Sequence, residues 1–204
     1  MNPIRPILYL VVTVLLVGGC ATTAKTRNLF LLDQSGGTDS VTPRGKPSDS
    51  PLPTFTLSRV TLAPYLAHRG IVYQTGPNRI AIADNNRWAA ALEHQITVGL
   101  YDALERGLAN VTVRRAANGV AQADLELTLT VHLKTFQGRY DGNAVISGAW
   151  RLFDEKGQLI SRGEFSRETP LQEDGYPALV RALSQGWRFV KRSLVEELGK
   201  ALNL

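Results

Sequence analysis

Ten consecutive residues in the second half of the chain, 125–134, alternate strictly between aliphatic and polar side chains. Successive side chains of a β-strand point to opposite faces, so this pattern gathers the aliphatic side chains on one face. The run therefore predicts a long strand in a sheet that has one buried and one wetter face. The aliphatic set is Leu125, Leu127, Leu129, Val131 and Leu133, and the polar set is Glu126, Thr128, Thr130, His132 and Lys134.

Two further strand-like stretches follow this run at short distances. Residues 138–143 and 154–157 are rich in the Gly, Asn and Asp that favour turns, and they delimit stretches 144–153 and 158–168. Short turns join antiparallel neighbours, so the three stretches are predicted to form an antiparallel meander. Its inward positions would be Ile146, Gly148, Trp150 and Leu152 on the second strand, and Leu159 and Phe165 on the third.

An amphipathic helix is predicted before the meander, because apolar residues recur there every four positions. We place its start near Trp88, with Asp84, Asn85 or Asn86 as the N-cap, and its C-terminal cap at Gly107. Its apolar stripe consists of Trp88, Leu92, Ile96, Leu100 and Leu104, with Ala89 and Ala103 beside it.

A second amphipathic helix is predicted to close the chain over residues 176–202. Gly186 inside it costs about 1 kcal/mol relative to alanine, so we expect the helix to bend or to pack closely at that position. Its stripe is Leu179, Leu183, Trp187, Val190, Leu194 and Leu198.

The remaining segments complete an α+β domain: an antiparallel sheet with the two amphipathic helices packed on one face, in two layers. Pro64 is expected to end a strand and open a helical turn, and residues 33–53, rich in Pro, Ser and Gly, are expected to form a flexible loop. Short strands are predicted at 28–32, 54–62 and 111–113, with a hairpin formed by 71–73 and 80–82.

The first twenty residues indicate where the chain works. Arg5 is followed by an apolar run at 7–17, interrupted only by Thr13, which is 11 residues where a membrane-spanning helix needs roughly 20. The run ends in Val17-Gly18-Gly19-Cys20, an aliphatic residue, two small ones and a cysteine, which matches the bacterial lipobox. We therefore predict a lipoprotein-type signal peptide at 1–19 and lipidation of Cys20.

Cleavage would leave about 185 residues, enough for one sizeable domain. We divide them into a lipidated tether at 20–27 and a single domain at 28–204. Cys20 is the only cysteine, so no intramolecular disulfide can form, and its expected modification is an N-acyl diacylglycerol group with palmitate among the acyl chains. Ala21 stands where aspartate would favour retention in the inner membrane, so we expect the periplasmic face of the outer membrane.

Signatures of catalysis and of cofactor binding are absent from the sequence. It holds no Gly-x-Ser-x-Gly elbow, no His-Glu-x-x-His, no phosphate-binding glycine loop and no cysteine pair. His68, His94 and His132 lie far apart, and Asp124 with Glu126 would sit side by side on a strand rather than face each other across a gap. We predict no catalytic residue, no metal site and no cofactor.

The net charge of +5 for the full chain fits anionic headgroups or an ordinary solvated surface, and does not require nucleic acid.

Arg188, Lys191 and Arg192 form a basic group late in the closing helix. One interpretation is favourable placement of cations in the C-terminal half of a helix, which we prefer, and the other is contact with phosphate headgroups. Arg87 and Trp88 also have two interpretations: Trp88 as a core residue, and Arg87 stacked on an aromatic ring or contacting a partner.

The order of several short motifs resembles the ABC-type transport auxiliary lipoproteins, the PqiC/YmbA family. The resemblance spans nearly the whole mature chain and is densest from Val60 to Leu104, although the 33–53 segment is longer and richer in proline than expected. The matching motifs are the lipobox, the strand at 28–32, Leu62-Ala63-Pro64-Tyr65-Leu66, Ile71-Val72, Asn78-Arg79-Ile80 and Arg87-Trp88-Ala89-Ala90-Ala91-Leu92.

This resemblance implies a non-enzymatic subunit of an intermembrane lipid-transport system that supports membrane integrity. The implied partners are an MCE-domain periplasmic protein, an integral inner-membrane subunit and, as a ring, further copies of the chain. Pro64, Tyr65, Leu66, Arg87 and Trp88 would form a partner or packing motif. Two alternative functions stay open. One is an assembly-factor lipoprotein that helps fold or insert an outer-membrane component, and the other is a lipoprotein hydrolase, which no residue pattern in the sequence supports.

Overall fold

The computed structural model describes residues 26–33, 54–58, 60–108, 111–115 and 126–202. The predicted signal peptide, Cys20 and nearly all of the 33–53 loop lie outside these residues, as does Asp124. Among the described helices, none combines the length and the apolar character that crossing a membrane would require.

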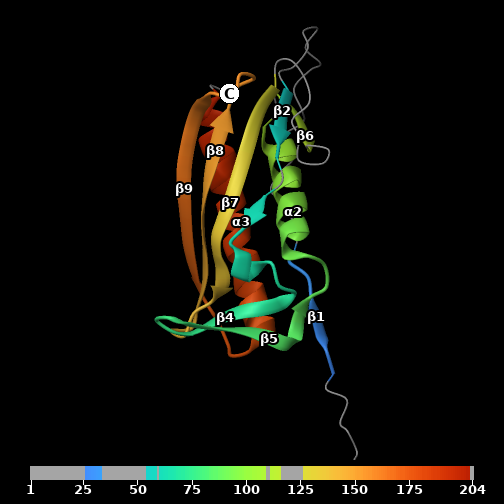
Figure 1. Cartoon of the computed structure of the whole chain (residues 1–204), viewed down its shortest axis with the longest axis vertical. Helices are drawn as coiled ribbons and strands as arrows, with labels where there is room; N and C mark the ends of the chain where they lie inside the picture. The colour runs from blue at the N-terminus through green and yellow to red at the C-terminus, as the bar shows by residue number, and fades with distance from the viewer. Residues whose placement is uncertain (1–25, 34–53, 59, 109–110, 116–125, 203–204) are drawn as a thin grey trace, which may run out of the picture.

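Strand β7 (Glu126–Gly138) is the strand to which most of the sheet is attached. Along one edge it pairs antiparallel with β8 (Asn143–Phe153), which pairs antiparallel with β9 (Leu159–Pro170), as Figure 1 shows. The predicted meander is therefore confirmed. The alternation of β7 is confirmed as well: Leu129, Val131 and Leu133 are buried, whereas His132 and Lys134 are exposed.

The opposite edge of β7 is covered by three short strands that follow one another along the chain. These are β2 (Thr54–Leu57), β3 (Thr61–Leu62) and β4 (Gly70–Gly76), and all three pair with β7 in parallel. The expectation of a wholly antiparallel sheet is therefore wrong, because the sheet is mixed. The single strand expected at 54–62 is divided in two, and both parts use the same edge of β7.

The sheet of nine described strands is completed by β5, β1 and β6. β4 and β5 (Arg79–Trp88) form the predicted hairpin, and β1 (Asn28–Phe30) adds in parallel to the far end of β5. β6 (Thr112–Arg115) pairs in parallel with β2. In Figure 1 the β4–β5 hairpin forms the lower end of the domain, and the chain enters β1 from the same end.

The start of the first helix was predicted four residues too early, and residues 84–88 belong to β5. Helix α2 runs Leu92–Gly107, and its N-cap Ala91 makes no side-chain capping bond, so the proposed caps are wrong. Strand pairing explains the difference: residues 86–88 pair with Asn28–Phe30 of β1, and Arg87 pairs with Gly70 of β4. The Trp88 N–H also donates to the carbonyl of Arg69 at 2.7 Å, and the Ala89 N–H donates to Phe30 at 2.8 Å.

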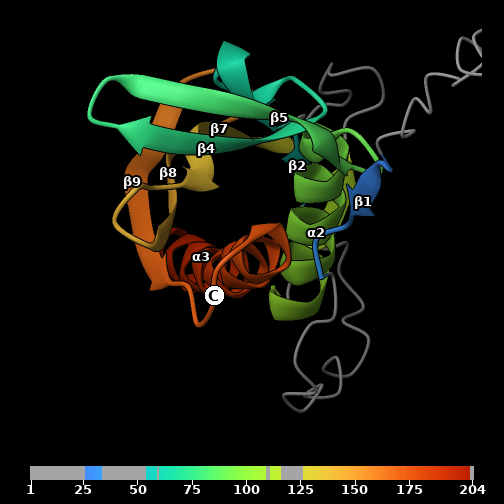
Figure 2. The same ribbon diagram turned by 90° about the horizontal axis from the view of Figure 1, so that it is seen from below.

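Helix α3 (Tyr176–Ala201) lies inside the curl of the sheet, against β7, β8 and β9, with α2 beside it (Figure 2). The α+β class with two amphipathic helices is confirmed, and all six predicted stripe residues of α3 are buried.

Gly107 is the last residue of α2 and not a left-handed cap; a Cβ there would lie 2.4 Å from Cγ1 of Val195 on α3. The glycine therefore permits the close approach of the two helices.

Aromatic rings fill the centre of this core. Trp88 lies 6.2 Å from Phe136 between ring centroids, and Trp187 lies 6.5 Å from both Phe136 and Phe165. Gly186 precedes Trp187 on α3, and a Cβ there would lie 3.0 Å from Thr169 Oγ1. This confirms the close packing expected at Gly186 and seats Trp187 deep against β7–β9.

The contact of β8 with both neighbouring strands gives a stability prediction. A Cβ at Gly148 would lie 2.3 Å from the carbonyl oxygen of His132 and 2.5 Å from the Phe165 ring. The backbone oxygen cannot move without breaking the ladder, so Gly148→Ala should lower the free energy of unfolding by about 1–3 kcal/mol. Denaturant titration measures the change. Gly76→Ala is the control, because nothing lies within 4 Å of its Cβ position; equal losses for both variants would contradict the argument.

Candidate functional site

The Pro64, Tyr65 and Leu66 motif forms the predicted helical turn, a 3-10 turn named η1 (Pro64–Leu66), between β3 and β4. Leu66 is buried in the core, and the Tyr65 hydroxyl donates to the carbonyl of Lys134 at 2.8 Å. Burial raises the pKa of the Tyr65 hydroxyl above its ordinary value, so the hydroxyl stays protonated and can donate. The described contacts of this motif hold the β3–β4 connection against β7.

Arg87 and Trp88 end β5 and have separate surroundings. Trp88 is buried in the core, as one of the two interpretations had it. Arg87 Nε donates to the carbonyl of Asp84 at 2.6 Å. The arginines that stack on aromatic rings in the described structure are instead Arg115, over Tyr101, and Arg167, over Phe189.

Residues 28–33, which we call the strap, connect the predicted tether to both helices. The strap pairs with β5 through β1 and then passes between α2 and α3. Leu32 is buried, and its N–H donates to Gln95 Oε1 of α2 at 2.8 Å. Asp33 N–H donates to Ser184 Oγ of α3 at 3.1 Å, and the Asp33 carboxylate lies 3.4 Å from Arg188 Nη1. The strap is therefore fixed by groups from both helices.

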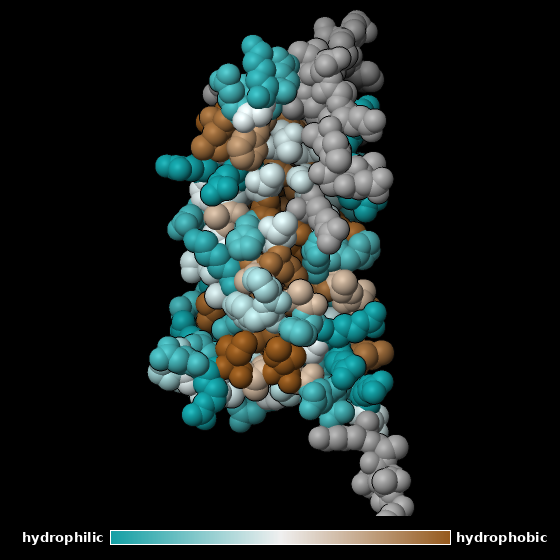
Figure 3. All heavy atoms as spheres, in the orientation of Figure 1, coloured by the Kyte–Doolittle hydropathy of each residue, from teal (hydrophilic) through white to brown (hydrophobic). Residues whose placement is uncertain are grey.

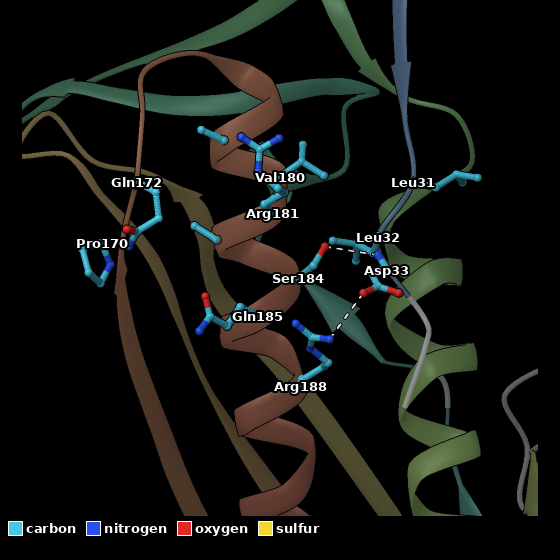
Figure 4. A pocket seen from close by; sticks show the side chains of 12 residues that line it. Leu31, Leu32, Asp33, Pro170, Gln172, Val180, Arg181, Ser184, Gln185 and Arg188 are labelled. Atoms are coloured by element: carbon cyan, nitrogen blue, oxygen red, sulfur yellow. Dashed lines mark hydrogen bonds and ion pairs between the residues drawn. The ribbon is translucent and has the colours of Figure 1, made fainter. Parts of the chain in front are cut away.

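A groove of about 650 Å³ lies between the strap, the first half of α3 and the end of β9 (Figure 4). Its lining combines aliphatic side chains with polar and basic ones. Leu31 on the strap side is 62% exposed, and its side chain points away from α3 in Figure 4. The lining residues are Leu31, Leu32, Asp33, Pro170, Gln172, Ala178, Val180, Arg181, Ala182, Ser184, Gln185 and Arg188.

Two arginines supply the positive charge of the groove. Arg181 and Arg188 lie seven residues apart on α3, which places them two turns apart on one helical face. Arg181 pairs with Glu173, and Arg188 pairs with Asp33. Both ion pairs are solvent-exposed, and such pairs contribute little to stability. The arginines can therefore exchange these partners for an anionic group at low cost.

Lys191 is separated from the basic group that the sequence suggested. It is only 4% exposed, whereas Arg188 and Arg192 are exposed. Burial lowers the pKa of the Lys191 ammonium below its ordinary value of 10.5, and repulsion from Arg106 and Arg188 lowers it further, against attraction to Asp102 and Asp33. The prediction that Lys191 contacts headgroups is therefore wrong, whereas contact of Arg188 and Arg192 with headgroups stays a prediction. The sequence grouped Lys191 with these two arginines, but α2 covers the side of α3 that carries Lys191.

Arg139, Asp141 and Glu168 form a cluster of ion pairs around the β7–β8 connection. Arg139 donates to both oxygens of Glu168, at 2.8 and 2.5 Å, and to Asp141 at 2.7 Å. These hydrogen bonds lower the pKa of the Glu168 and Asp141 carboxyls and raise that of Arg139. Within the described residues, no group of three His, Cys, Asp or Glu could hold a metal ion. The groove combines aliphatic side chains with two arginines and the carboxylate of Asp33.

A family model for the ABC-type transport auxiliary lipoprotein component matches residues 31–195, which include the whole groove. The chain belongs to this family. The auxiliary lipoprotein is 33% identical over 188 residues to the intermembrane transport lipoprotein PqiC of Escherichia coli (strain K12), which covers 92% of this chain and 94% of the relative. PqiC of Shigella flexneri matches it equally. It is thus a lipoprotein component of a transport system, in a family that is not one of enzymes.

Solved structures share the auxiliary lipoprotein's fold. The crystal structure of an uncharacterized protein superposes with a TM-score of 0.67 at 31% identity, over 85% of this chain and 99% of that one. A protein from Xanthomonas campestris gives 0.65 at 16% identity, over 80% of this chain and 93% of that one, which shows the fold alone.

Sequence reasoning identified Arg188 of the groove but missed the polar residues that fix the strap beside it. Asp33 was assigned to the flexible loop, and Gln95 and Ser184 are polar residues inside two otherwise apolar helical faces, where they are 5% and 4% exposed. A buried polar side chain needs a partner. Their position on the buried faces was the available signal that another segment passes there, but the sequence did not show which one.

Gln95 tests whether the strap depends on its contact with α2. Gln95→Met keeps the volume but leaves the Leu32 N–H without its acceptor, which should lower the free energy of unfolding by about 1–3 kcal/mol. Hydrogen exchange should show faster exchange at Leu32 and its strap neighbours. Thr97→Val is the control, since it removes a hydrogen bond within α2, to the Glu93 carbonyl, and does not contact the strap; strap exchange as fast in this control would contradict the assignment.

Lys191 gives a prediction of opposite sign. Lys191→Met keeps the packing of the aliphatic stem and removes a buried charge, so it should raise the free energy of unfolding by about 1 kcal/mol near neutral pH. Because the folded pKa is lowered, the unfolded chain binds more protons between that pKa and 10.5, and the advantage of the variant should shrink as pH rises through this window. Denaturant titrations across pH measure it. Lys191→Ala should instead destabilise, because it also loses the stem; a variant advantage that grows with pH would refute the argument.

Proposed function

We propose that the chain is a non-enzymatic auxiliary subunit of an MCE-type intermembrane lipid-transport system, held at the periplasmic face of the outer membrane by acyl groups on Cys20. The observation that carries this proposal is the 33% identity, over nearly the full length, to lipoproteins named for intermembrane transport. The lipobox at Val17–Cys20 supports the anchor, and Ala21 supports the outer membrane.

The groove supports a binding role for the domain. Its aliphatic floor and exposed arginines suit an amphiphilic segment or a lipid with an anionic group better than a small polar substrate. We infer that this face of α3, together with the strap, contacts the MCE-domain protein that carries lipid across the periplasm. An inner-membrane subunit would complete the system at the other end, beyond the reach of this domain.

Site-specific photo-crosslinking in cells tests the proposed partner. A photoreactive residue at Arg181 in the groove should capture an MCE-domain protein, identified by mass spectrometry. The matched control is the same residue at Arg162, which is exposed on β9 and points away from α3. Because the proposal needs the anchor, Cys20→Ala should abolish capture at Arg181 while leaving a folded, soluble domain.

The captured proteins decide between the candidate functions. Adducts with barrel-assembly components alone would support an assembly-factor lipoprotein and refute the transport proposal. Adducts between copies of the chain would support the expected ring. The transport proposal still requires the MCE adduct, so adducts between copies alone would refute it. Equal capture at Arg162 and Arg181 would refute the assignment of the groove.

A further inference from the structure

The outer face of the β4–β5 hairpin carries exposed aliphatic side chains. Ile80 and Ile82 lie two residues apart on β5, which places them on the same face of the strand, and they are 44% and 38% exposed. In Figure 3 hydrophobic side chains gather low in the view, over this hairpin. Exposed aliphatic pairs of this kind are typical of surfaces that meet a partner or a membrane.

The charge around these isoleucines is positive. Between residues 67 and 88 the sequence contains Arg69, Arg79 and Arg87 against a single acid, Asp84, and no glutamate. Arg69 and Arg79 are exposed. Basic residues next to exposed aliphatic ones favour an anionic phospholipid surface, because headgroups attract the cations while the acyl boundary accepts the aliphatic side chains.

The hairpin also lies close to the point where the anchor enters the domain. Asn28, the first residue of β1, is paired with Asn86 of β5, so Ile82 and Ile80 lie about 13 and 20 Å along the strand from it, at about 3.3 Å per residue. If Cys20 is lipidated, eight residue steps separate it from Asn28, a reach of at most about 29 Å. The leaflet that holds the acyl chains can therefore reach the hairpin.

We propose that the β4–β5 hairpin rests on the phospholipid leaflet that holds the anchor, with Ile80 and Ile82 at the boundary between headgroups and acyl chains. The proposal rests on the lipidation of Cys20 in the proposed function. A chain attached only through a short tether can rotate above the membrane, whereas a second contact at the hairpin fixes one orientation. That orientation holds the far end of β7, near Glu126, away from the leaflet.

Fluorescence depth measurements on the lipidated chain test this contact. With Cys20 blocked by its lipid, Ile82→Cys provides a single thiol for an environment-sensitive NBD label, and the chain is reconstituted into vesicles of phosphatidylethanolamine and phosphatidylglycerol. The label should show a blue-shifted emission and should be quenched by nitroxide-labelled lipid. The matched control is Ile160→Cys, 48% exposed, on β9 beside the opposite end of β7, where the label should keep aqueous emission. Thermal unfolding in detergent confirms that both labelled chains fold.

Each result decides the proposal. A blue shift and quenching at position 82 but not at 160 support it. Aqueous emission at both positions, with an acyl group found on Cys20 by mass spectrometry, overturns this proposal and leaves the anchor in place. An unmodified Cys20 overturns both proposals. A label at position 82 that is already shielded in detergent, with crosslinks between copies, assigns the hairpin to a contact between chains and overturns membrane contact.

Discussion

The pairing of both edges of β7 is the constraint on which the rest of the domain depends. One edge holds β8 along its length, whereas the other holds β2, β3 and β4 in turn. β2 and β3 are aligned by four and two residue pairs with β7, whereas β4 meets β7 at the single pair Tyr73–Gly138. Because β4 leads into β5, and β5 pairs with β1, the position of the strap also follows from β7.

The packing of α3 extends this dependence from the sheet to the groove. Trp187 contacts both Phe136 of β7 and Phe165 of β9, so the helix is seated by aromatic rings from both sides of the meander. Gly186 lets the helix approach closely enough for those contacts. Once α3 is seated, Ser184 and Arg188 face the strap, and the remaining exposed side of the helix lines the groove.

Long periodic segments were predictable from sequence, and segments governed by partners distant in sequence were not. The alternation of β7 and the stripe of α3 reflect burial, which the pattern of apolar residues records directly. Trp88 fitted the helical period equally well, but its amide bonds to Arg69, and no local pattern encodes that pairing. The parallel attachment of β2 and β3 was missed for the same reason. In the groove, sequence patterns identified Arg188 but neither Arg181 nor Asp33, and the position of Asp33 depends on Ser184, a residue 151 positions away.

The strap gives the anchor a mechanical connection to both helices. A force applied at the tether reaches β1 first, where the parallel ladder with β5 bears it in shear, and reaches Gln95 and Ser184 only after that ladder yields. The buried bond from Leu32 to Gln95 is protected from competing water, whereas the Asp33–Arg188 pair is exposed and weak. The position of the strap therefore depends on the backbone and on Gln95 more than on Arg188. The same segment that leads from the predicted tether into the domain thus forms one wall of the groove.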